Sequence, residues 1–187
     1  MNAFWSRPAP LVAPELIGGS LLVNGLCCTI AETEAYFSED DLACHASKGR
    51  TPRTETLYGP PGTLYVYLCY GMHHLLNVVT DREGIPSAVL IRGVIFDGLD
   101  PRRSNGPGKV AKLLGLDRRH NGQALGKVLH LTPPPTNRTP PNVCCGPRIG
   151  IDYAGDVWRD KPWRWWIAGF PAVKPVACWI SSGENPN

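Results

Sequence analysis

Twenty glycines and nineteen prolines punctuate this chain of 187 residues. So many helix-breaking residues are incompatible with a bundle of long helices. The pattern therefore predicts short elements joined by turns. Hydrophobic residues make up 43% of the chain and charged residues 19%, so the segments between the turns carry enough apolar surface to form a folded core.

Most of the segments between the turns have the pattern of β-strands. Residues 11–23 are expected to form a short helix that ends at Gly18 and Gly19, followed by a strand. Further strands are predicted at residues 26–36, 63–70, 75–80, 87–96, 163–168 and 173–180. The remaining expectations are a helix, a single helical turn and an irregular proline-rich connector, at residues 109–116, 40–47 and 132–142.

Strands that follow one another closely, with few helices between them, favour an antiparallel or mixed sheet. We therefore predict an α+β fold rather than a doubly wound parallel one. No repeat or boundary divides the sequence, so residues 1–187 are expected to form a single domain.

Charge is unevenly distributed along the chain. Residues 1–41 hold one arginine against six acidic residues, whereas residues 42–119 hold eleven lysines and arginines against six acids. A basic central region suits a polyanionic partner such as nucleic acid, although an ordinary solvated surface explains the same count.

The seven cysteines do not form a metal-binding pattern. Cys27-Cys28 and Cys144-Cys145 are adjacent pairs rather than the spaced pairs that hold zinc. The odd count and the absence of a signal-peptide pattern predict reduced thiols in a cytoplasmic protein. No apolar run reaches the roughly 18 residues that a membrane span needs. Neither a metal nor a membrane partner is expected.

Three residues with polar side chains fall on one face of an expected strand. Side chains two residues apart on a strand point the same way, so Glu32, Glu34 and Tyr36 share a face. That face continues from Cys28 and Ile30 and is expected to point toward the core, where a carboxylate needs a partner or a function. A strand with its glutamates in water is the alternative.

Asn77 and Arg92 lie inside two other apolar strands. A buried arginine requires an anion, and Glu34 is the candidate partner. Such a pair would hold the Glu34 carboxylate ionised and fixed in direction. Asn77 could then hydrogen-bond a water or a ligand in the same place.

Four tyrosines crowd into thirteen positions, and two of them, Tyr65 and Tyr67, share a strand face. They either stack on a ligand or belong to the core, and the core is the better reading for Tyr65. Tyr70 falls at the turn of the expected hairpin, where an exposed aromatic ring could act as a wedge between base pairs.

The loop before this hairpin carries His45 and, after it, Lys48, Arg50 and Arg53. A loop histidine is commonly a surface residue. Basic side chains on a loop rich in glycine and proline can contact phosphates, and they can equally be solvated charges.

Taken together and in order, these motifs resemble the alkyladenine (3-methyladenine) DNA glycosylase family, the human-type monofunctional methylpurine glycosylases. The resemblance runs from about residue 11 to residue 170 and rests on Glu32-Thr33-Glu34-Ala35-Tyr36, His45, Gly49-Arg50-Thr51-Pro52-Arg53, Gly59-Pro60-Pro61-Gly62-Thr63-Leu64-Tyr65-Val66-Tyr67, Tyr70-Gly71-Met72, Asn77, Leu90-Ile91-Arg92, Gly106-Pro107-Gly108-Lys109 and Pro147-Arg148-Ile149-Gly150.

The resemblance implies a curled, roll- or barrel-like sheet with short helices around it and a protruding hairpin. It implies a base-excision-repair hydrolase that flips a damaged purine out of duplex DNA and cleaves its N-glycosidic bond, without a cofactor or a metal. The substrates implied are 3-methyladenine, 7-methylguanine, hypoxanthine and ethenoadenine.

By position, Glu34 resembles the family's general base and Arg92 the arginine that orients the carboxylate and the water. The resemblance further assigns a base pocket, an intercalating residue and contacts to the DNA backbone, at Tyr36, His45, Tyr67 and Asn77, at Tyr70, and at Arg50, Arg53 and Lys109. No lysine nucleophile is expected at the pocket. A compact, monomeric, bacterial-type member that acts at the nucleoid is expected.

Three features depart from the family or receive no role: residues 73–76, the connector at 132–142 and the tryptophan-rich segment at 163–166. Two other functions remain open from the residues alone. One is a non-catalytic protein that binds damaged or kinked DNA. The other is a small-molecule hydrolase that uses Glu32 and Glu34 as paired carboxylates.

Overall fold

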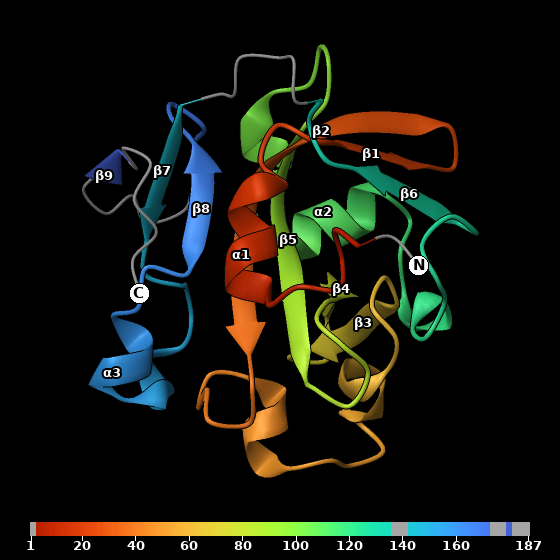
Figure 1. Cartoon of the computed structure of the whole chain (residues 1–187). Coiled ribbons are helices and arrows are strands. Elements are labelled where there is room, and N and C mark those ends of the chain that lie inside the picture. Colours follow the sequence, from red (N-terminus) through yellow and green to blue (C-terminus); the bar gives the residue numbers. More distant parts are fainter. Residues whose placement is uncertain (1–2, 136–141, 173–178, 181–187) are drawn as a thin grey trace.

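Strands β2 and β5 form the centre of a nine-stranded sheet in which every pair of registered neighbours is antiparallel (Figure 1). The computed structural model describes residues 3–135, 142–172 and 179–180. The strand order is β3-β4-β5-β2-β8-β7-β9, and β1 pairs with both β2 and β6. The strands are β1 Ser20–Val23, β2 Leu26–Phe37, β3 Leu64–Cys69, β4 His73–Val79, β5 Ser87–Ile95, β6 Leu129–Thr132, β7 Val143–Gly146, β8 Arg164–Ile167 and β9 Trp179–Ile180.

The helices are short and lie around this sheet, which confirms the predicted α+β class. The α-helices are α1 Ala9–Glu15, α2 Pro107–Leu113 and α3 Asp156–Arg159, and the 3-10 helices are His45–Lys48, Glu55–Tyr58, Pro101–Arg103, Arg118–His120 and Asp152–Ala154. Proline within the first two positions suits the start of α1 and of α2, because those positions need no backbone donor.

Helix α1 covers one face of the central strands. Its residues Val12 and Ala13 are fully buried, and the hydroxyl of Thr33 on β2 donates a hydrogen bond to the Ala13 carbonyl at 2.9 Å. Because α1 takes the face of β2 that carries Thr33, the glutamates on either side of Thr33 point to the opposite face. Strand β2 is therefore buried on both faces from Ile30 to Ala35, and the buried side chains include the polar Glu32, Thr33 and Glu34.

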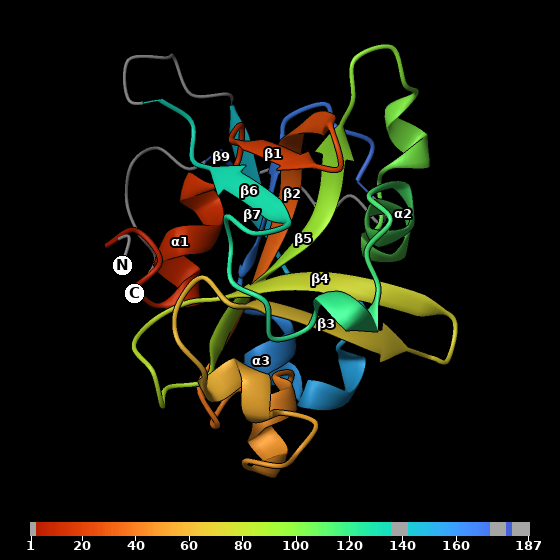
Figure 2. The ribbon, with the colours of Figure 1, turned by 90° about the vertical axis from the view of Figure 1, so that its right-hand side faces the viewer.

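The hairpin of β3 and β4 runs across the two central strands and projects to the side of the sheet away from α1 (Figure 2). Its turn contains Tyr70 and Gly71, which have φ angles of 49° and 69°, and Met72 N donates to the Cys69 carbonyl at 3.1 Å. Positive φ at both central residues is what a tight hairpin turn of the type I′ class requires. The turn predicted at this place is confirmed.

A break in the β2–β5 register occurs where β2 presents its glutamates. Glu32 lies opposite Gly93, with register shifts on both sides of Glu32. A side chain at Gly93 would meet the ring of Phe170 at 2.6 Å and the Cβ of Glu32 at 3.0 Å. The bulge and the glycine therefore leave room for the Glu32 side chain beneath Phe170.

The structure departs from the sequence predictions in several local details. The helical turn expected near residues 40–47 lies at His45–Lys48, a second one occurs at Glu55–Tyr58, and strands β6 and β7 were not predicted. Cys144 is disulfide-bonded, so the expectation of reduced thiols throughout is wrong at this position. Most of the proline-rich connector and of the strand predicted at 173–180 lies outside the described residues, and the single domain over 1–187 stays a prediction.

Candidate active site

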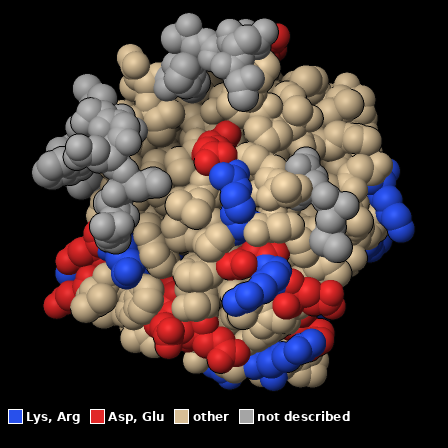
Figure 3. All heavy atoms as spheres, in the orientation of Figure 1, with Lys and Arg blue, Asp and Glu red and all other residues tan. Residues whose placement is uncertain are grey.

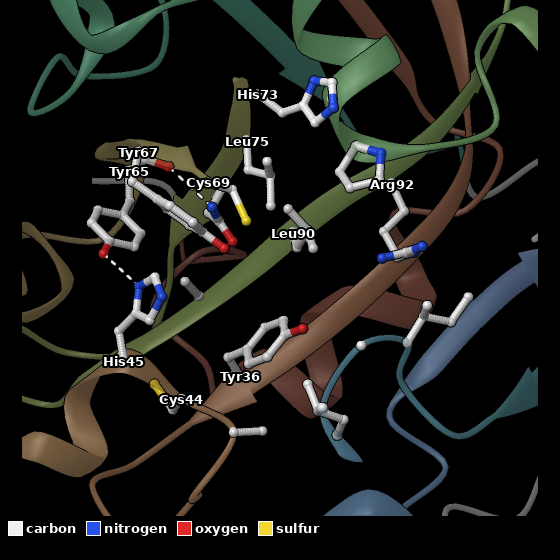
Figure 4. A pocket seen from close by; sticks show the side chains of 18 of the residues that line it. Tyr36, Cys44, His45, Tyr65, Tyr67, Cys69, His73, Leu75, Leu90 and Arg92 are labelled. Carbon is white, nitrogen blue, oxygen red and sulfur yellow. Dashed lines mark hydrogen bonds between the residues drawn. The ribbon is translucent and has the colours of Figure 1, made fainter. Parts of the chain in front are cut away.

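A cavity of about 600 Å³ lies between the β3–β4 hairpin, the face of β2 and β5 opposite α1, and the segments before α2 and after β7. Figure 4 shows side chains from β2, β3, β4 and β5 converging on it. Eight of the ten predicted site residues line this cavity: Tyr36, His45, Arg53, Tyr67, Tyr70, Asn77, Arg92 and Lys109. The two that do not are Glu34 and Arg50.

Glu34 lies one layer behind the cavity wall and is completely buried. Its Oε2 accepts a hydrogen bond from the Tyr36 hydroxyl at 2.8 Å, and its Oε1 accepts one from the backbone N–H of Ile149 at 2.8 Å. The Nε atom of Arg92 is 3.4 Å from the same Oε1. The three residues that hold this carboxylate all line the cavity. The expectation that Glu34 is buried rather than solvated is confirmed, as is its pairing with Arg92.

Arg92 forms ion pairs with two glutamates, of which Glu34 is one. Its Nε is also 3.4 Å from Oε1 of Glu32, whose Oε1 in turn accepts a hydrogen bond from Arg164 at 3.0 Å. We refer to Glu32, Glu34, Arg92 and Arg164 as the buried ionic cluster. Burial raises the pKa of Glu32, and the two arginines oppose that effect.

Aromatic rings form one wall of the cavity. The ring centroids of Tyr65 and Tyr67 are 5.2 Å apart, and His45 meets Tyr67 edge-on with centroids 4.5 Å apart. Tyr65 is 3% exposed and packs in a small core cluster, whereas Tyr67 is partly exposed to the cavity. The prediction that Tyr65 belongs to the core is thus confirmed. The prediction that Tyr65 and Tyr67 share a strand face is confirmed as well.

His45 is tied into this wall and does not behave as a surface histidine. Its Nδ1 is 2.8 Å from the Tyr65 hydroxyl (Figure 4). Burial, together with the positive charges of Arg53 and Lys48, lowers the pKa of His45 to about 4. The imidazole is therefore neutral near pH 7, and it presents a ring without charge to whatever enters the cavity.

A second buried ion pair supports the Tyr36 side of the cavity. Arg148 donates to both carboxylate oxygens of Asp41, at 2.6 and 2.9 Å, and to the Ala35 carbonyl at 2.9 Å. The guanidinium carbon of Arg148 lies 4.8 Å from the centroid of the Tyr36 ring. The pair holds Tyr36 in place by a cation–π contact from one side.

Three further predicted residues are positioned as follows. Asn77 is buried, and its Nδ2 donates to the Tyr65 carbonyl at 3.1 Å, across the β3–β4 pair. Lys109 lines the cavity, and its Nζ donates to two oxygens, the Arg102 carbonyl at 2.8 Å and Asn105 Oδ1 at 2.7 Å. Arg50 forms an exposed ion pair with Glu55 at 2.6 Å.

Tyr70 stands at the edge of the cavity on the hairpin turn, with 86% of its surface exposed. The neighbouring Met72 is 73% exposed. A tyrosine with positive φ is uncommon and costs conformational energy. Two large apolar side chains held in solvent at one tip form a surface suited to contact with a partner.

Sequence reasoning missed Asp41 and Arg164. Arg148 was part of a recognised motif but received no role. Arg164 is completely buried on β8, where its Nε donates to the Pro147 carbonyl at 2.8 Å and its guanidinium lies 4.3 Å from the Trp166 ring centroid. An arginine flanked by three tryptophans was the available signal, because such a position on a strand is buried and needs an anion.

Among the described residues, no group of three or more histidine, cysteine, aspartate or glutamate side chains could hold a metal ion. The described helices are all too short or too polar to cross a membrane.

Residues 3–171 match the family described as methylpurine-DNA glycosylase (MPG). A protein of Myxococcus xanthus is 51% identical over 176 residues, which cover 89% of this chain and 88% of that protein. Proteins of Ehrlichia chaffeensis and Anaeromyxobacter dehalogenans are 40% identical over 168 residues (89% and 91% covered) and 43% identical over 181 residues (92% and 83% covered). All three bear the name "Putative 3-methyladenine DNA glycosylase". The chain belongs to the methylpurine-DNA glycosylase family, and is a DNA glycosylase, a hydrolase that acts on N-glycosyl bonds.

Proposed function

We propose that this protein flips an alkylated or deaminated purine out of duplex DNA into the cavity and hydrolyses its N-glycosidic bond with a water that Glu34 activates. The substrate class is 3-methyladenine, 7-methylguanine, hypoxanthine and ethenoadenine. The observation that carries the proposal is the buried Glu34 carboxylate, held by Tyr36, Arg92 and Ile149, which all line one cavity.

The contacts of Glu34 suit a general base. The guanidinium of Arg92 and two hydrogen-bond donors, the Tyr36 hydroxyl and the Ile149 N–H, surround the carboxylate. Because both oxygens are already held, the carboxylate has one fixed orientation, and a water bound at the wall between Arg92 and Ile149 would meet Oε1.

For an alkylated, cationic base the chemistry balances with water and Glu34 alone. The water oxygen forms a bond to the anomeric carbon of the sugar, and its proton passes to Glu34. The bond between that carbon and the purine nitrogen breaks, and the electron pair leaves with the base. An alkylated base is a cation and departs neutral, whereas hypoxanthine or ethenoadenine needs a proton as it leaves. General-base help of this kind is worth on the order of 100- to 10,000-fold in rate.

The aromatic wall suits a flipped purine. Tyr36, His45 and Tyr67 offer ring faces and edges for stacking. An uncharged His45 imposes no repulsion on an alkylated, cationic base. Asn77 lines the cavity from β4, and in this proposal its side chain disfavours bases with an extra exocyclic amine.

In this proposal DNA binds on the side of the molecule away from α1, where the hairpin projects (Figure 2). Tyr70 would take the space of the extruded nucleotide, and Arg53 and Lys109 at the cavity would contact the backbone. On the α1 face, acidic and basic side chains are interspersed over one half and the visible part of the other is largely uncharged (Figure 3). Where the described residues of that face are visible, they form no continuous basic surface of the kind that a polyanion favours. We propose a monomer that acts in the bacterial cytoplasm at the nucleoid.

The test uses duplexes that each hold one lesion, incubated with excess protein and then treated with alkali to cut abasic sites. We expect strand cleavage at the lesion with the wild-type protein. Glu34→Gln keeps the shape of the side chain, and we expect it to bind lesion duplex and excise at least 100-fold more slowly. Full activity in Glu34→Gln would sink the mechanism.

Absence of cleavage with wild-type protein on all four lesions, alongside tight lesion binding, would identify a non-catalytic binder instead. Steep loss of binding with added salt separates either DNA-binding protein from a small-molecule hydrolase, because only phosphate contacts release counterions.

A further inference from the structure

We propose that Glu32 and Arg164 are positioning residues, a buried counter-ion pair that determines how much of the Arg92 charge acts on Glu34. The inference rests on the proposed role of Glu34 as general base. It assigns a function to the tryptophan-rich segment on β8, which the sequence left without one.

The Nε atom of Arg92 lies at the same distance from both glutamates. It lies 3.4 Å from Oε1 of Glu32 and 3.4 Å from Oε1 of Glu34. At neither distance does that Nε–H make a hydrogen bond, although the atom is completely buried. Arg92 is thus attracted to both carboxylates, and the loss of charge on either one would move it toward the other.

Arg164 lies opposite Glu34 in the β2–β8 pair, but its guanidinium forms its ion pair with Glu32, and this ion pair breaks the symmetry. Its Nη1 donates to Glu32 Oε1 at 3.0 Å, and both side chains are completely buried. The guanidinium is fixed on its far side by the Pro147 carbonyl and by the ring of Trp166. The negative charge of Glu32 is therefore shared between two arginines, which leaves Arg92 available to Glu34.

The remaining titratable and charged groups that face Glu34 come from every neighbouring element. They are Glu32 and Tyr36 on β2, Tyr67 on β3, Arg92 on β5, Arg148 after β7 and Arg164 on β8. The charge of Arg148 is matched by Asp41 at 2.6 Å, and both tyrosines have a raised pKa and stay neutral. Neither Glu32 nor Arg164 lines the cavity, so the charge of each can be altered without replacing a residue of the cavity wall.

Removing the charge of Glu32 and removing the charge of Arg164 should affect the ionised form of Glu34 in opposite directions. In Glu32→Gln, a negative neighbour is lost and Arg92 pairs with Glu34 alone, which favours the carboxylate. In Arg164→Met, Arg92 is the remaining counter-ion of Glu32 in the buried ionic cluster. A negative charge on Glu34, beside Glu32, is then disfavoured. If Glu32 and Arg164 served only packing, the two variants would not change the ionisation of Glu34 in opposite directions.

The experiment measures the single-turnover rate of 7-methylguanine excision from duplex DNA between about pH 5 and about pH 8. This base is cationic on the acid side of neutrality, so the acid limb of the profile reports the protein. We expect Glu32→Gln to move the acid limb to lower pH and Arg164→Met to move it to higher pH, each by about one unit. The double variant Glu32→Gln/Arg164→Met should return the limb to its wild-type position.

Two controls keep the outcome decisive. Arg164→Lys retains the charge and should keep the wild-type profile. If Arg164→Met alone does not fold, as judged by circular dichroism, the shift of Glu32→Gln and its reversal in the double variant carry the test. Shifts in the same direction, or none, with Glu34→Gln inactive, would overturn this inference and leave the proposed function standing. An active Glu34→Gln would instead overturn the proposed function itself.

Discussion

The hydroxyl of Tyr36 donates a hydrogen bond to Glu34 at 2.8 Å, two residues back along the same strand. The ring of Tyr36 lines the cavity, whereas the carboxylate that it contacts lies behind the cavity wall. One side chain therefore joins the surface that meets a base to the group proposed to activate water. Burial, and next the charge of Glu34, raises the pKa of Tyr36, so its hydroxyl keeps the proton that it donates.

Tyr36→Phe separates these two contributions. The ring remains, but Glu34 loses a donor that is worth about 1.5–3 kcal/mol for a charged acceptor. We expect excision to fall by about tenfold or more while lesion binding stays within about threefold of wild type. Tyr36→Ala is the comparison and should lose both. Equal loss of binding and excision in Tyr36→Phe would argue against a separate role for the hydroxyl.

Tyr70→Ser tests the wedge. Because Tyr70 is 86% exposed and has a positive φ, its removal should leave Tm nearly unchanged. Lesion-duplex binding should weaken by about tenfold, since base–aromatic stacking contributes about 1–3 kcal/mol. Tyr65→Ser is the matched buried control and should destabilise the protein by about 3 kcal/mol. A large fall in Tm for Tyr70→Ser would place Tyr70 in the core instead.

Stability should fall as the pH is lowered toward 4, partly through His45. Its pKa is about 4 in the folded protein, lowered from 6.5 by burial and by the positive charges of Arg53 and Lys48. Between these values the unfolded chain binds a proton that the folded chain does not, so acid favours unfolding there. The contribution is on the order of 2 kcal/mol across this window. His45→Gln should remove this contribution. Urea titrations at several pH values would measure the unfolding free energy of both proteins. An equally steep fall with decreasing pH in the wild type and in His45→Gln would show that the prediction is wrong.

The buried pair of Asp41 and Arg148 should matter to the fold far more than an exposed pair does. Asp41→Asn leaves the Arg148 guanidinium buried without its anion and should cost about 3–5 kcal/mol of unfolding free energy. Arg50→Gln breaks an exposed pair of similar length with Glu55, and should cost less than about 1 kcal/mol. Comparable costs in the two variants, measured by denaturant unfolding, would contradict this ranking.

Lys109 is the lysine that lines the cavity among the described residues, yet we expect no covalent intermediate from it. Its Nζ is engaged with the Arg102 carbonyl and Asn105 Oδ1, and hydrolysis by water needs no amine. Borohydride added during turnover should therefore trap no protein–DNA adduct. A trapped adduct that disappears in Lys109→Gln would show a lysine nucleophile and exclude a purely hydrolytic reaction.

The sequence by itself predicted several of the local elements and which side chains share the site. Glycine and proline spacing, alternation along residues 26–36 and the aromatic run before Tyr70 were sufficient for helices α1 and α2, the long strand and the hairpin, because these depend on neighbours in the chain. The shared face of Glu32, Glu34 and Tyr36 follows from the period of a strand. The pairing of Arg92 with Glu34 followed from the need of a buried charge for a partner.

Tertiary structure decided which groups share those charges. Arg164 is 132 residues from Glu32, and Arg148 is 107 residues from Asp41, and no periodicity links positions so far apart. Their contacts exist because β8 pairs with β2 and because β7 is followed by a segment that crosses the end of the cavity. Tertiary structure also placed Glu34 behind the wall rather than in it, since strand alternation gives the face of a side chain and only packing gives its depth.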